Sequence, residues 1–354
     1  MVAWRGSPIV DTTVAQPKMT TNVPGLPDRL GGSGNMPPTR SFIPFHVRVS
    51  GMAHHDPGSK DPLSIHGVVP PTVTAFHDDE SVDYETTAAH ARFVVERGAH
   101  AVFPLGTNGE FPLLTGEERK RVTEAVVEEI NGDVPVIAGV GAPSTRETVD
   151  HARHAESVGA DGIVVVTPYY FPLDHEAALR HYRGVARATD LPIYIYHIPS
   201  KTGNRLSRST LAALADIDAI AGVKDSSKDV PWLAQSIDSH PELTFLAGSD
   251  SLLFTGLEIG CSGMVSAVAN VFPELVVDLY EAYDAGDEDR ARERQGEVYA
   301  VRDALKGGGA YMSGVKTALR LRDFDAGPLR TPLRLKDDDD AAQLAADLEA
   351  LGLL

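Results

Sequence analysis

Short apolar runs alternate with longer amphipathic stretches from residue 67 onward, and this alternation is the main structural signal of the chain. The runs are rich in Val and Ile and have the length of strands that are covered on both faces, as in a parallel sheet. They predict eight strands, at residues 68–74, 101–105, 134–140, 162–167, 192–196, 220–224, 244–247 and 263–267.

The stretches between these runs have a helical period. They predict helices such as 84–97, 115–131 and 145–158, and Gly98 and Gly159 supply the glycine that often ends a helix. Past Pro273 the chain becomes mostly helical, with helices predicted at 274–285, 288–305, 310–321 and 340–351. Eight strand–helix units favour the α/β class and a closed (β/α)8 TIM barrel with a C-terminal helical appendage. An open doubly wound sheet is the alternative, although it usually has fewer units.

Residues 1–64 differ from the rest of the chain. They contain nine Pro and seven Gly and show neither a helical nor a strand period, which predicts a disordered N-terminal extension. The expected division is therefore the extension at 1–64, the barrel at 65–286 and the helical region at 287–354. We also hypothesise that Met52 is the true start of the protein. N-terminal sequencing of the native protein that finds Met1 would reject this hypothesis.

Composition narrows the class of protein. The chain has 354 residues and a net charge of −18, and the part after residue 64 carries 26 Lys/Arg against 46 Asp/Glu. This charge argues against nucleic acid as a partner. Only nine of the 32 basic residues are lysine, which favours a protein adapted to a high-salt cytoplasm over an ordinary acidic enzyme. The single Cys261, the lack of a signal-like N-terminus and the lack of a membrane-length apolar run all predict a cytoplasmic location.

Candidate chemistry is sought at the carboxyl ends of the strands, because barrel active sites lie there. The second strand leads into Gly106–Thr107–Asn108–Gly109–Glu110, a loop whose backbone N–H groups could bind a carboxylate, although a plain tight turn explains it equally well. On the fifth strand, Tyr194 and Tyr196 share a face by the two-residue period and are expected to point into the barrel. A phenol there can relay protons, while simple aromatic packing is favoured for Tyr194.

Lys224 ends the apolar sixth strand. Burying an ammonium is costly, and desolvation lowers the lysine pKa, so that the neutral amine can attack a carbonyl group. The competing interpretation is an ordinary ion pair with Asp225. Small residues follow at the ends of the seventh and eighth strands, including Gly248 and Ser249, and they either leave room for a ligand or allow tight packing.

Four segments together resemble the dihydrodipicolinate synthase/N-acetylneuraminate lyase family of pyruvate-dependent aldolases. They are GTNGE at 106–110, PYY at 168–170, Tyr196 with Pro199 and Thr202–Gly203, and GVKDSS at 222–227. The resemblance covers residues 65–300. It implies that Lys224 is the Schiff-base lysine, that Tyr196 relays protons, and that Thr107 links Tyr196 to Tyr170, which in the family often reaches into a neighbouring subunit.

The resemblance also implies the ligands. The substrates are a 2-oxo acid and an aldehyde, the intermediate is a covalent imine with pyruvate on Lys224, and no metal or other cofactor is required. A homo-oligomer, typically a dimer of dimers, is expected. The substrate-binding residues are assigned as Asn108, Gly109, Lys201, Gly248, Ser249 and Val265.

Three departures from the synthase pattern affect the substrate. Lys201 stands where an arginine is usual, Asn108 replaces a second threonine, and Phe171 follows Tyr170. Because lysine lacks the planar fork of arginine, these changes favour a 2-keto-3-deoxy sugar acid aldolase of the 2-keto-3-deoxygluconate type. Dihydrodipicolinate synthase is the main alternative, a dehydratase acting on a keto-deoxy sugar acid is another, and a non-catalytic barrel protein would be expected to lack the lysine or the tyrosine.

Overall fold

The computed structural model describes residues 63–307 and 310–354. Residues 1–62 of the predicted extension, which include the alternative start at Met52, lie outside the described residues, whereas Leu63 is buried in a hydrophobic cluster. In the described part, seven strands form one parallel sheet, whose order follows the chain around the barrel. The strands in that order are β1 Gly67–Val68, β9 Gly263–Met264, β8 Thr244–Ala247, β7 Ile220–Asp225, β6 Ile193–His197, β5 Gly162–Val166 and β4 Ile137–Gly139.

The remaining predicted strand, at 101–105, closes the sheet between β1 and β4. On one side, the backbone N–H of His100 donates to Val68 and that of Phe103 donates to Pro70. On the other side, Val102 forms a parallel bridge with Val136. The segment therefore has partners along both edges, and the (β/α)8 barrel predicted from the sequence is confirmed.

The first predicted strand, 68–74, is shorter than expected. Pro70 and Pro71 have no N–H to donate, so regular pairing ends after Val68. The chain instead forms a small antiparallel hairpin from β2 Ala75–Phe76 and β3 Val82–Asp83, which the sequence pattern did not predict.

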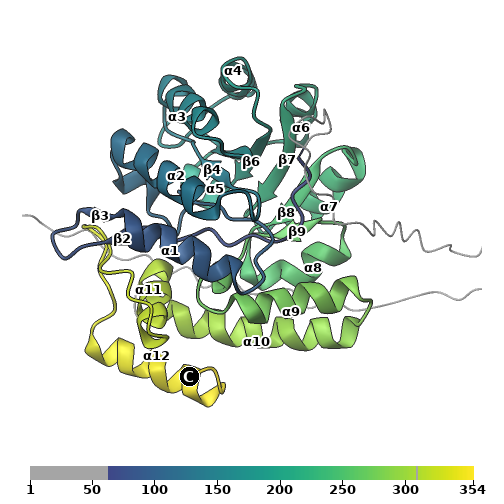
Figure 1. Cartoon of the computed structure of the whole chain (residues 1–354). Coiled ribbons are helices and arrows are strands. Elements are labelled where there is room, and N and C mark those ends of the chain that lie inside the picture. The colour runs from purple at the N-terminus through teal and green to yellow at the C-terminus, as the bar shows by residue number, and fades with distance from the viewer. Residues whose placement is uncertain (1–62, 308–309) are drawn as a thin grey trace, which may run out of the picture. The chain divides into compact units, whose positions relative to one another are not determined.

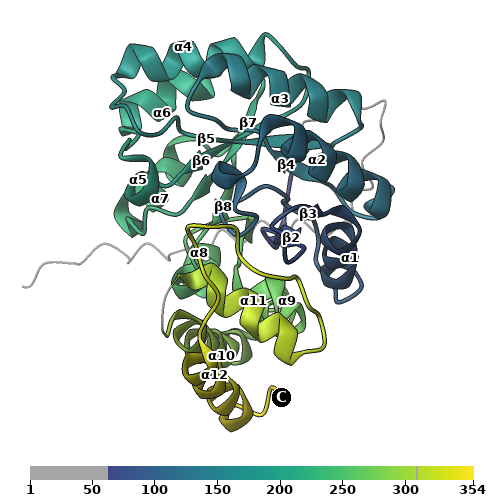
Figure 2. The same cartoon turned by 90° about the vertical axis from the view of Figure 1, so that its left-hand side faces the viewer.

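Helices surround the strands, as Figures 1 and 2 show. Most of the longer helices begin after a Ser, Thr or Asp that accepts a hydrogen bond from a first-turn N–H, as Thr115 does from Glu118 in a complete capping box. The α-helices are α1 Tyr84–Val95, α2 Gly116–Ile130, α3 Thr145–Ser157, α4 His175–Ala186, α5 Pro199–Thr202, α6 Arg208–Ala215, α7 Val230–Ser239, α8 Leu253–Glu258, α9 Pro273–Asp284, α10 Glu288–Lys306, α11 Tyr311–Leu321 and α12 Asp338–Ala350. Short 3-10 turns lie at Phe111–Leu113, Asp250–Leu252 and Val268–Asn270.

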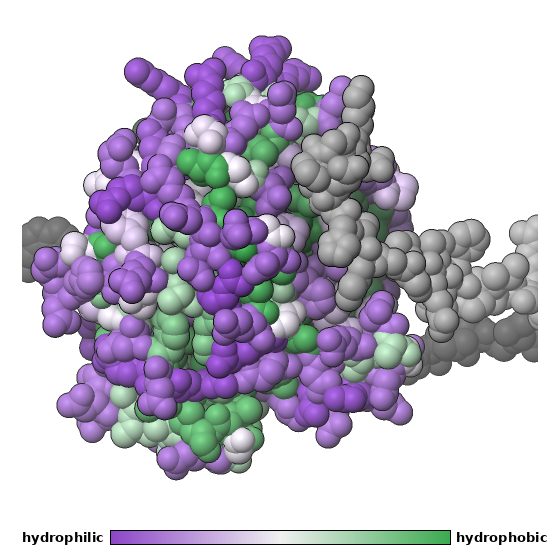
Figure 3. Space-filling model, viewed as in Figure 1, coloured by the Kyte–Doolittle hydropathy of each residue, from purple (hydrophilic) through white to green (hydrophobic). Residues whose placement is uncertain are grey.

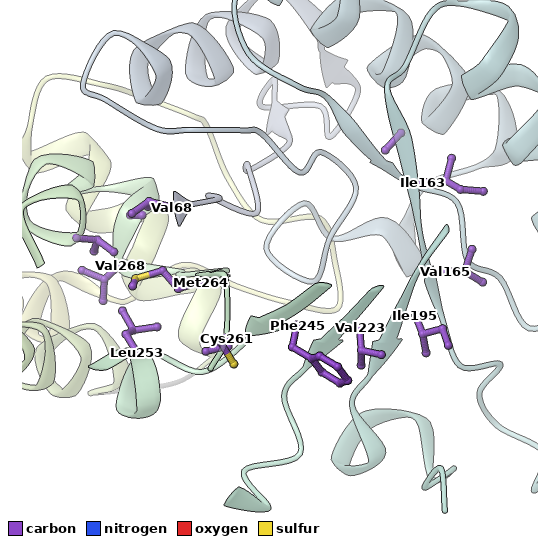
Figure 4. Close-up of a cluster of buried hydrophobic side chains, with 14 of the residues drawn as sticks. Val68, Ile163, Val165, Ile195, Val223, Phe245, Leu253, Cys261, Met264 and Val268 are labelled. Carbon is purple, nitrogen blue, oxygen red and sulfur yellow. The ribbon is translucent and has the colours of Figure 1, made fainter. Parts of the chain in front are cut away.

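The two faces of the strands enter two different hydrophobic clusters. Ile163, Val165, Ile195, Val223 and Phe245 belong to the cluster between sheet and helices (Figure 4). The alternating residues, such as Val164, Val166, Tyr194 and Tyr196, belong to a second cluster, which also takes in buried residues of α1 and α2. The two-residue period therefore directs Tyr194 and Tyr196 inward, as predicted.

The C-terminal helices pack against the barrel and against one another, with α10 in contact with α9, α11 and α12. Their most buried polar contact is between Lys316 of α11 and Glu110, whose Nζ and Oε1 atoms are 3.1 Å apart.

None of the described helices is long and apolar enough to cross a membrane. Hydrophilic side chains cover most of the face in Figure 3, in keeping with the charged composition.

Candidate functional site

The register between β6 and β7 sets the centre of the site. Tyr196 is paired with Lys224, and the next pair along the strands is His197 with Asp225. Because successive side chains point to opposite faces, Tyr196 and Lys224 share the barrel interior while His197 and Asp225 face the helices. Both pairs lie at the carboxyl ends of the strands, where barrel enzymes place their chemistry.

Lys224 is a buried amine without an ion pair. Its side chain is 4% exposed, and no carboxylate of the described chain lies within 4 Å of its Nζ. Nζ is 3.6 Å from the centre of the Tyr196 ring and 4.8 Å from that of Phe103. Burial lowers the pKa of Lys224, against the opposing effects of Tyr196 and Asp250.

Asp225 is therefore not the partner of Lys224, which was the competing interpretation from the sequence. Its Oδ1 is 2.8 Å from Nδ1 of His197, and its Oδ2 accepts a hydrogen bond from the Ser227 hydroxyl at 2.9 Å. The carboxylate is thus engaged on the outer face of the sheet, and the amine of Lys224 is left free for chemistry inside the barrel.

Tyr196 is joined to the loop after the second strand segment. Its hydroxyl lies 3.2 Å from Oγ1 of Thr107. Burial raises the pKa of Tyr196, but the charge of Lys224 and the Thr107 hydroxyl outweigh burial, so the pKa falls below its usual range. A phenol that gives up its proton readily beside a buried amine is suited to proton transfer.

A cavity of about 230 Å³ opens above these two side chains. Eight of the residues predicted for the site line it: Thr107, Asn108, Tyr196, Lys201, Lys224, Gly248, Ser249 and Val265. Gly248 also packs tightly, since a Cβ there would lie 2.3 Å from the Ser226 Oγ. Both explanations given for this glycine from the sequence, room for a ligand and tight packing, therefore apply.

Two predicted site residues lie outside the cavity lining. Gly109 packs against backbone, because a Cβ there would lie 3.1 Å from the Thr72 carbonyl oxygen, and its own carbonyl accepts a hydrogen bond from Thr74. Tyr170 is 86% exposed and has a positive φ of 80°. Its ring stacks edge-on against Phe171, which is 69% exposed. Among the described residues, the side-chain hydrogen bond found for Thr107 is to Tyr196 and not to Tyr170.

Asp250 is a buried cavity residue that was not assigned to the site from the sequence. One carboxylate oxygen accepts a hydrogen bond from the Ser266 hydroxyl at 2.6 Å, and the other accepts one from Tyr311 at 2.8 Å. Its position directly after Gly248 and Ser249, at the end of a strand, is the sequence feature that could have assigned Asp250 to the site. No comparable sequence feature pointed to Tyr311, because this residue begins a helix of the C-terminal appendage and does not follow a strand.

Eight further residues line the cavity without having been predicted: Pro71, Ile198, Ser200, Ser226, Lys228, Ala267, Arg302 and Lys306. Ser226 and Lys228 follow Lys224 closely in the chain, whereas Arg302 and Lys306 lie on α10. Only the packing of α10 against the barrel brings these last two side chains to the site.

The fold and the site together define a class of protein. A lysine whose pKa is lowered, a tyrosine beside it and a loop of backbone amides form the arrangement that captures a carbonyl compound as an imine. The molecule is a barrel enzyme of the class I aldolase type.

Comparison with known proteins gives the family. The model of the dihydrodipicolinate synthetase family matches residues 64–351, and the chain belongs to this family of pyruvate-dependent class I lyases. An uncharacterized DapA-like lyase of Halobacterium salinarum is 72% identical over 84% of this chain and 98% of its own length. The 4-hydroxy-tetrahydrodipicolinate synthase of Methanopyrus kandleri is 40% identical over 82% of this chain and 98% of its own.

Two solved structures are similar to the barrel. Dihydrodipicolinate synthase of Thermotoga maritima has a TM-score of 0.78 and 31% identity, covering 82% of this chain and all of that one. The prophage protein YagE of Escherichia coli K12, solved in complex with pyruvate, has a TM-score of 0.78 and 32% identity, covering 82% of this chain and 99% of its own.

Proposed function

We propose that this enzyme cleaves a 2-keto-3-deoxy sugar acid, of the 2-keto-3-deoxygluconate type, into pyruvate and an aldehyde such as glyceraldehyde. The proposal rests on the polar groups that line the cavity beside Lys224. Ser226 and Ser249 line it with hydroxyl groups, and these can exchange hydrogen bonds with the hydroxyls of a sugar chain.

The reaction begins with an imine on Lys224. The neutral amine attacks the ketone carbon of the substrate, and water leaves after Tyr196 has moved the necessary protons. The backbone of the Thr107–Asn108 loop holds the carboxylate of the pyruvate half, because the N–H groups of such a loop favour an anion. The protonated imine is then ready to accept electrons.

Cleavage follows at the bond between C3 and C4. The electron pair of that bond moves into the imine to give an enamine, while the C4 hydroxyl loses its proton to Tyr196 and becomes the carbonyl of the released aldehyde. The enamine takes a proton at C3, and water hydrolyses the imine. These steps release pyruvate and restore the free amine of Lys224.

Synthase activity, the condensation of pyruvate with aspartate semialdehyde, is the second candidate. It is favoured by the named activity of relatives such as the Methanopyrus kandleri enzyme. Lys201 retains the positive charge that a second carboxylate needs, but it cannot bind that carboxylate through two parallel N–H groups as arginine does. The missing arginine is the reason for placing this activity second.

We further propose a homo-oligomer in which Tyr170 serves the site of a neighbouring subunit. The pair of exposed aromatic rings at Tyr170 and Phe171 supports this, because adjoining exposed aromatics are characteristic of interface residues. The acidic, lysine-poor composition and the Halobacterium salinarum relative support a role in high salt.

Borohydride reduction in the presence of pyruvate tests the central step. We expect an adduct in the intact mass that maps to Lys224 and is lost in Lys224→Met. Lys120→Met is the matched control, because Lys120 lies on α2 and pairs with Asp150 at 2.9 Å, away from the cavity. An adduct that is absent, or that maps to another lysine, overturns the mechanism.

Substrate choice is tested by comparing pyruvate release from 2-keto-3-deoxygluconate with condensation of pyruvate and aspartate semialdehyde. The proposal expects cleavage to have the larger kcat/KM. Lys201→Arg restores the fork of the synthase pattern, and for a sugar acid aldolase it should not make condensation the dominant activity. Condensation that already dominates in the unaltered enzyme rejects the proposal in favour of the synthase.

A further inference from the structure

Lysine is scarce in this protein and concentrated in one place. The chain has nine lysines, and four of them, Lys201, Lys224, Lys228 and Lys306, line the same cavity together with Arg302. None of these four lysines has a carboxylate within 4 Å in the described part of the chain. A chain with a net charge of −18 has thus gathered unpaired cations at its active site.

Two of these cations already have a role. Lys224 carries the imine, and Lys201 lies where the related synthases have a carboxylate-binding arginine. The other three, Lys228, Arg302 and Lys306, form a separate group. Lys228 lies in the loop after β7, whereas Arg302 and Lys306 are four residues apart on α10 and therefore share a helix face.

Helix-end effects and local ion pairs do not explain why all three of these cations lie at the cavity. Lys306 is in the last turn of α10, where a cation interacts favourably with the helix dipole, and Arg302 pairs with the exposed Asp303 at 2.9 Å. Neither explanation applies to Lys228, which adopts a positive φ of 62° outside any helix. A non-glycine residue in this conformation is uncommon, and here it places the side chain at the cavity.

The three cations repel one another. Partial burial lowers the pKa of Lys306, and the charges of Arg302 and Lys228 lower it further. The buried carboxylate of Asp250, which acts in the opposite direction on the pKa of Lys306, is already engaged by Ser266 and Tyr311. Arg302 has the exposed Asp303 as a partner, but in the described part of the chain neither Lys228 nor Lys306 forms an ion pair. Unpaired cations at a cavity are the condition expected of a site that receives a charged ligand.

We infer that Lys228, Arg302 and Lys306 form a subsite for a phosphate ester at the end of the substrate remote from the ketone. The inference rests on the proposed function, because it treats the substrate as a sugar acid whose carboxylate end lies over the Thr107–Asn108 loop. Three converging cations match a dianion better than a single carboxylate. The preferred substrate is accordingly a phosphorylated 2-keto-3-deoxy sugar acid.

The test compares cleavage of 2-keto-3-deoxy-6-phosphogluconate with cleavage of 2-keto-3-deoxygluconate. We expect kcat/KM to be larger for the phosphorylated substrate in the unaltered enzyme. Lys228→Gln and Lys306→Gln should each reduce this preference about ten-fold or more, mainly through KM, because each removes a charge-assisted hydrogen bond. Lys120→Gln, which removes a lysine of α2, is the matched control and should leave the preference as it was.

The outcomes separate the two proposals. If both sugar acids are cleaved equally well and the variants do not alter the ratio, the phosphate subsite is rejected while the aldolase proposal stands. If neither sugar acid is cleaved although pyruvate is trapped on Lys224, the proposed function itself is rejected, and the subsite with it. If the two variants impair condensation with aspartate semialdehyde, the cations bind a carboxylate and the phosphate assignment is wrong. Trapping of pyruvate in each variant checks that its barrel is folded.

Discussion

His197 and Asp225 form a hydrogen-bonded pair across β6 and β7, with 2.8 Å between Nδ1 and Oδ1. The backbone N–H of Leu206 donates to Nε2 of the same ring, so Nδ1 carries the proton and donates it to the carboxylate. Each member is the chain neighbour of a residue of the proposed reacting pair, Tyr196 or Lys224. The outer pair thus holds together the strand ends that carry the chemistry inside the barrel.

Loss of this pair should affect both stability and turnover. Asp225→Asn keeps the shape but removes the charge, and we expect a loss of about 1.5–3 kcal/mol in the free energy of unfolding, because a hydrogen bond to a charged group is weakened. The kcat for pyruvate release should fall more than KM rises, since the Tyr196–Lys224 spacing changes. Denaturant unfolding and steady-state kinetics measure the two effects.

The control for this prediction is the exposed pair of His240 and Glu242, which is 3.1 Å apart. Glu242→Gln should change stability by less than about 1 kcal/mol, as is usual for surface ion pairs. If Asp225→Asn behaves like Glu242→Gln in both measurements, the outer pair does not position the site.

Imine formation should depend on pH through Lys224. Only the neutral amine attacks a ketone, so the trapping rate should rise with pH and level off above the lysine pKa. Because burial lowers that pKa, the inflection is expected below the ordinary lysine value of about 10.4. Tyr196 opposes the lowering, so Tyr196→Phe should move the inflection to still lower pH. Cyanoborohydride trapping of pyruvate across a pH series measures it, and an inflection near 10.4 in both proteins would contradict the prediction.

The Thr107 hydroxyl should matter for proton transfer rather than for binding. Thr107→Val keeps the shape of the side chain but removes the hydrogen bond to Tyr196 at 3.2 Å. The pKa of Tyr196 should rise, because one of the groups that lowers it is lost. We expect kcat to fall about 10²-fold, a typical contribution of general acid–base catalysis, with a small change in KM. Thr107→Ser, which retains the hydroxyl, should recover most of the rate; equal losses in both variants would mean that the methyl group, and not the hydroxyl, matters.

The C-terminal appendage anchors the loop that carries Thr107 and Asn108. Glu110 ends that loop, forms an ion pair with Lys316 at 3.1 Å and accepts a hydrogen bond from the backbone N–H of Arg330 at 3.0 Å. Lys316→Met should therefore destabilise the protein by about 3–5 kcal/mol, because it leaves a buried carboxylate without its ion-pair partner. Thermal and denaturant unfolding measure this loss.

The pH dependence of that loss has a definite sign. Burial raises the pKa of Glu110, and removal of Lys316 raises it further. A folded-state pKa above the unfolded value means that stability increases as pH falls through the folded pKa. The penalty of Lys316→Met should thus be smaller at pH 5 than at pH 8, and adding Glu110→Gln should recover part of it at pH 8. A penalty that does not vary with pH would contradict the buried ion pair.

Salt should stabilise the protein. The net charge of −18 makes the folded state repel itself, and raising the ionic strength from 0.15 M to 1 M shortens the Debye length from about 8 Å to about 3 Å. We expect Tm to increase through this range of NaCl. Sorbitol at equal osmolality is the control for effects other than screening, and a Tm that is flat or falling in NaCl would count against the high-salt adaptation.

The sequence by itself determined the barrel, because strand length and the two-residue period are local properties of the chain. These properties also placed Lys224 and Tyr196 at strand ends. The roles predicted for Lys224, Tyr196 and Thr107 depended on the resemblance of four segments to a known family. The hairpin of β2 and β3 was missed because each of its strands is only two residues long, too short for a period to show.

The tertiary structure decided which distant residues join that pair. Tyr311, Arg302 and Lys306 belong to helices of the appendage, and their helical period shows which face is buried but not what covers it. Their arrival at the cavity depends on how α10 and α11 pack against the barrel, a long-range interaction that no local pattern contains. Likewise, only pairing across β6 and β7 showed that Asp225 turns away from Lys224, because adjacent residues of a strand face opposite sides of the sheet.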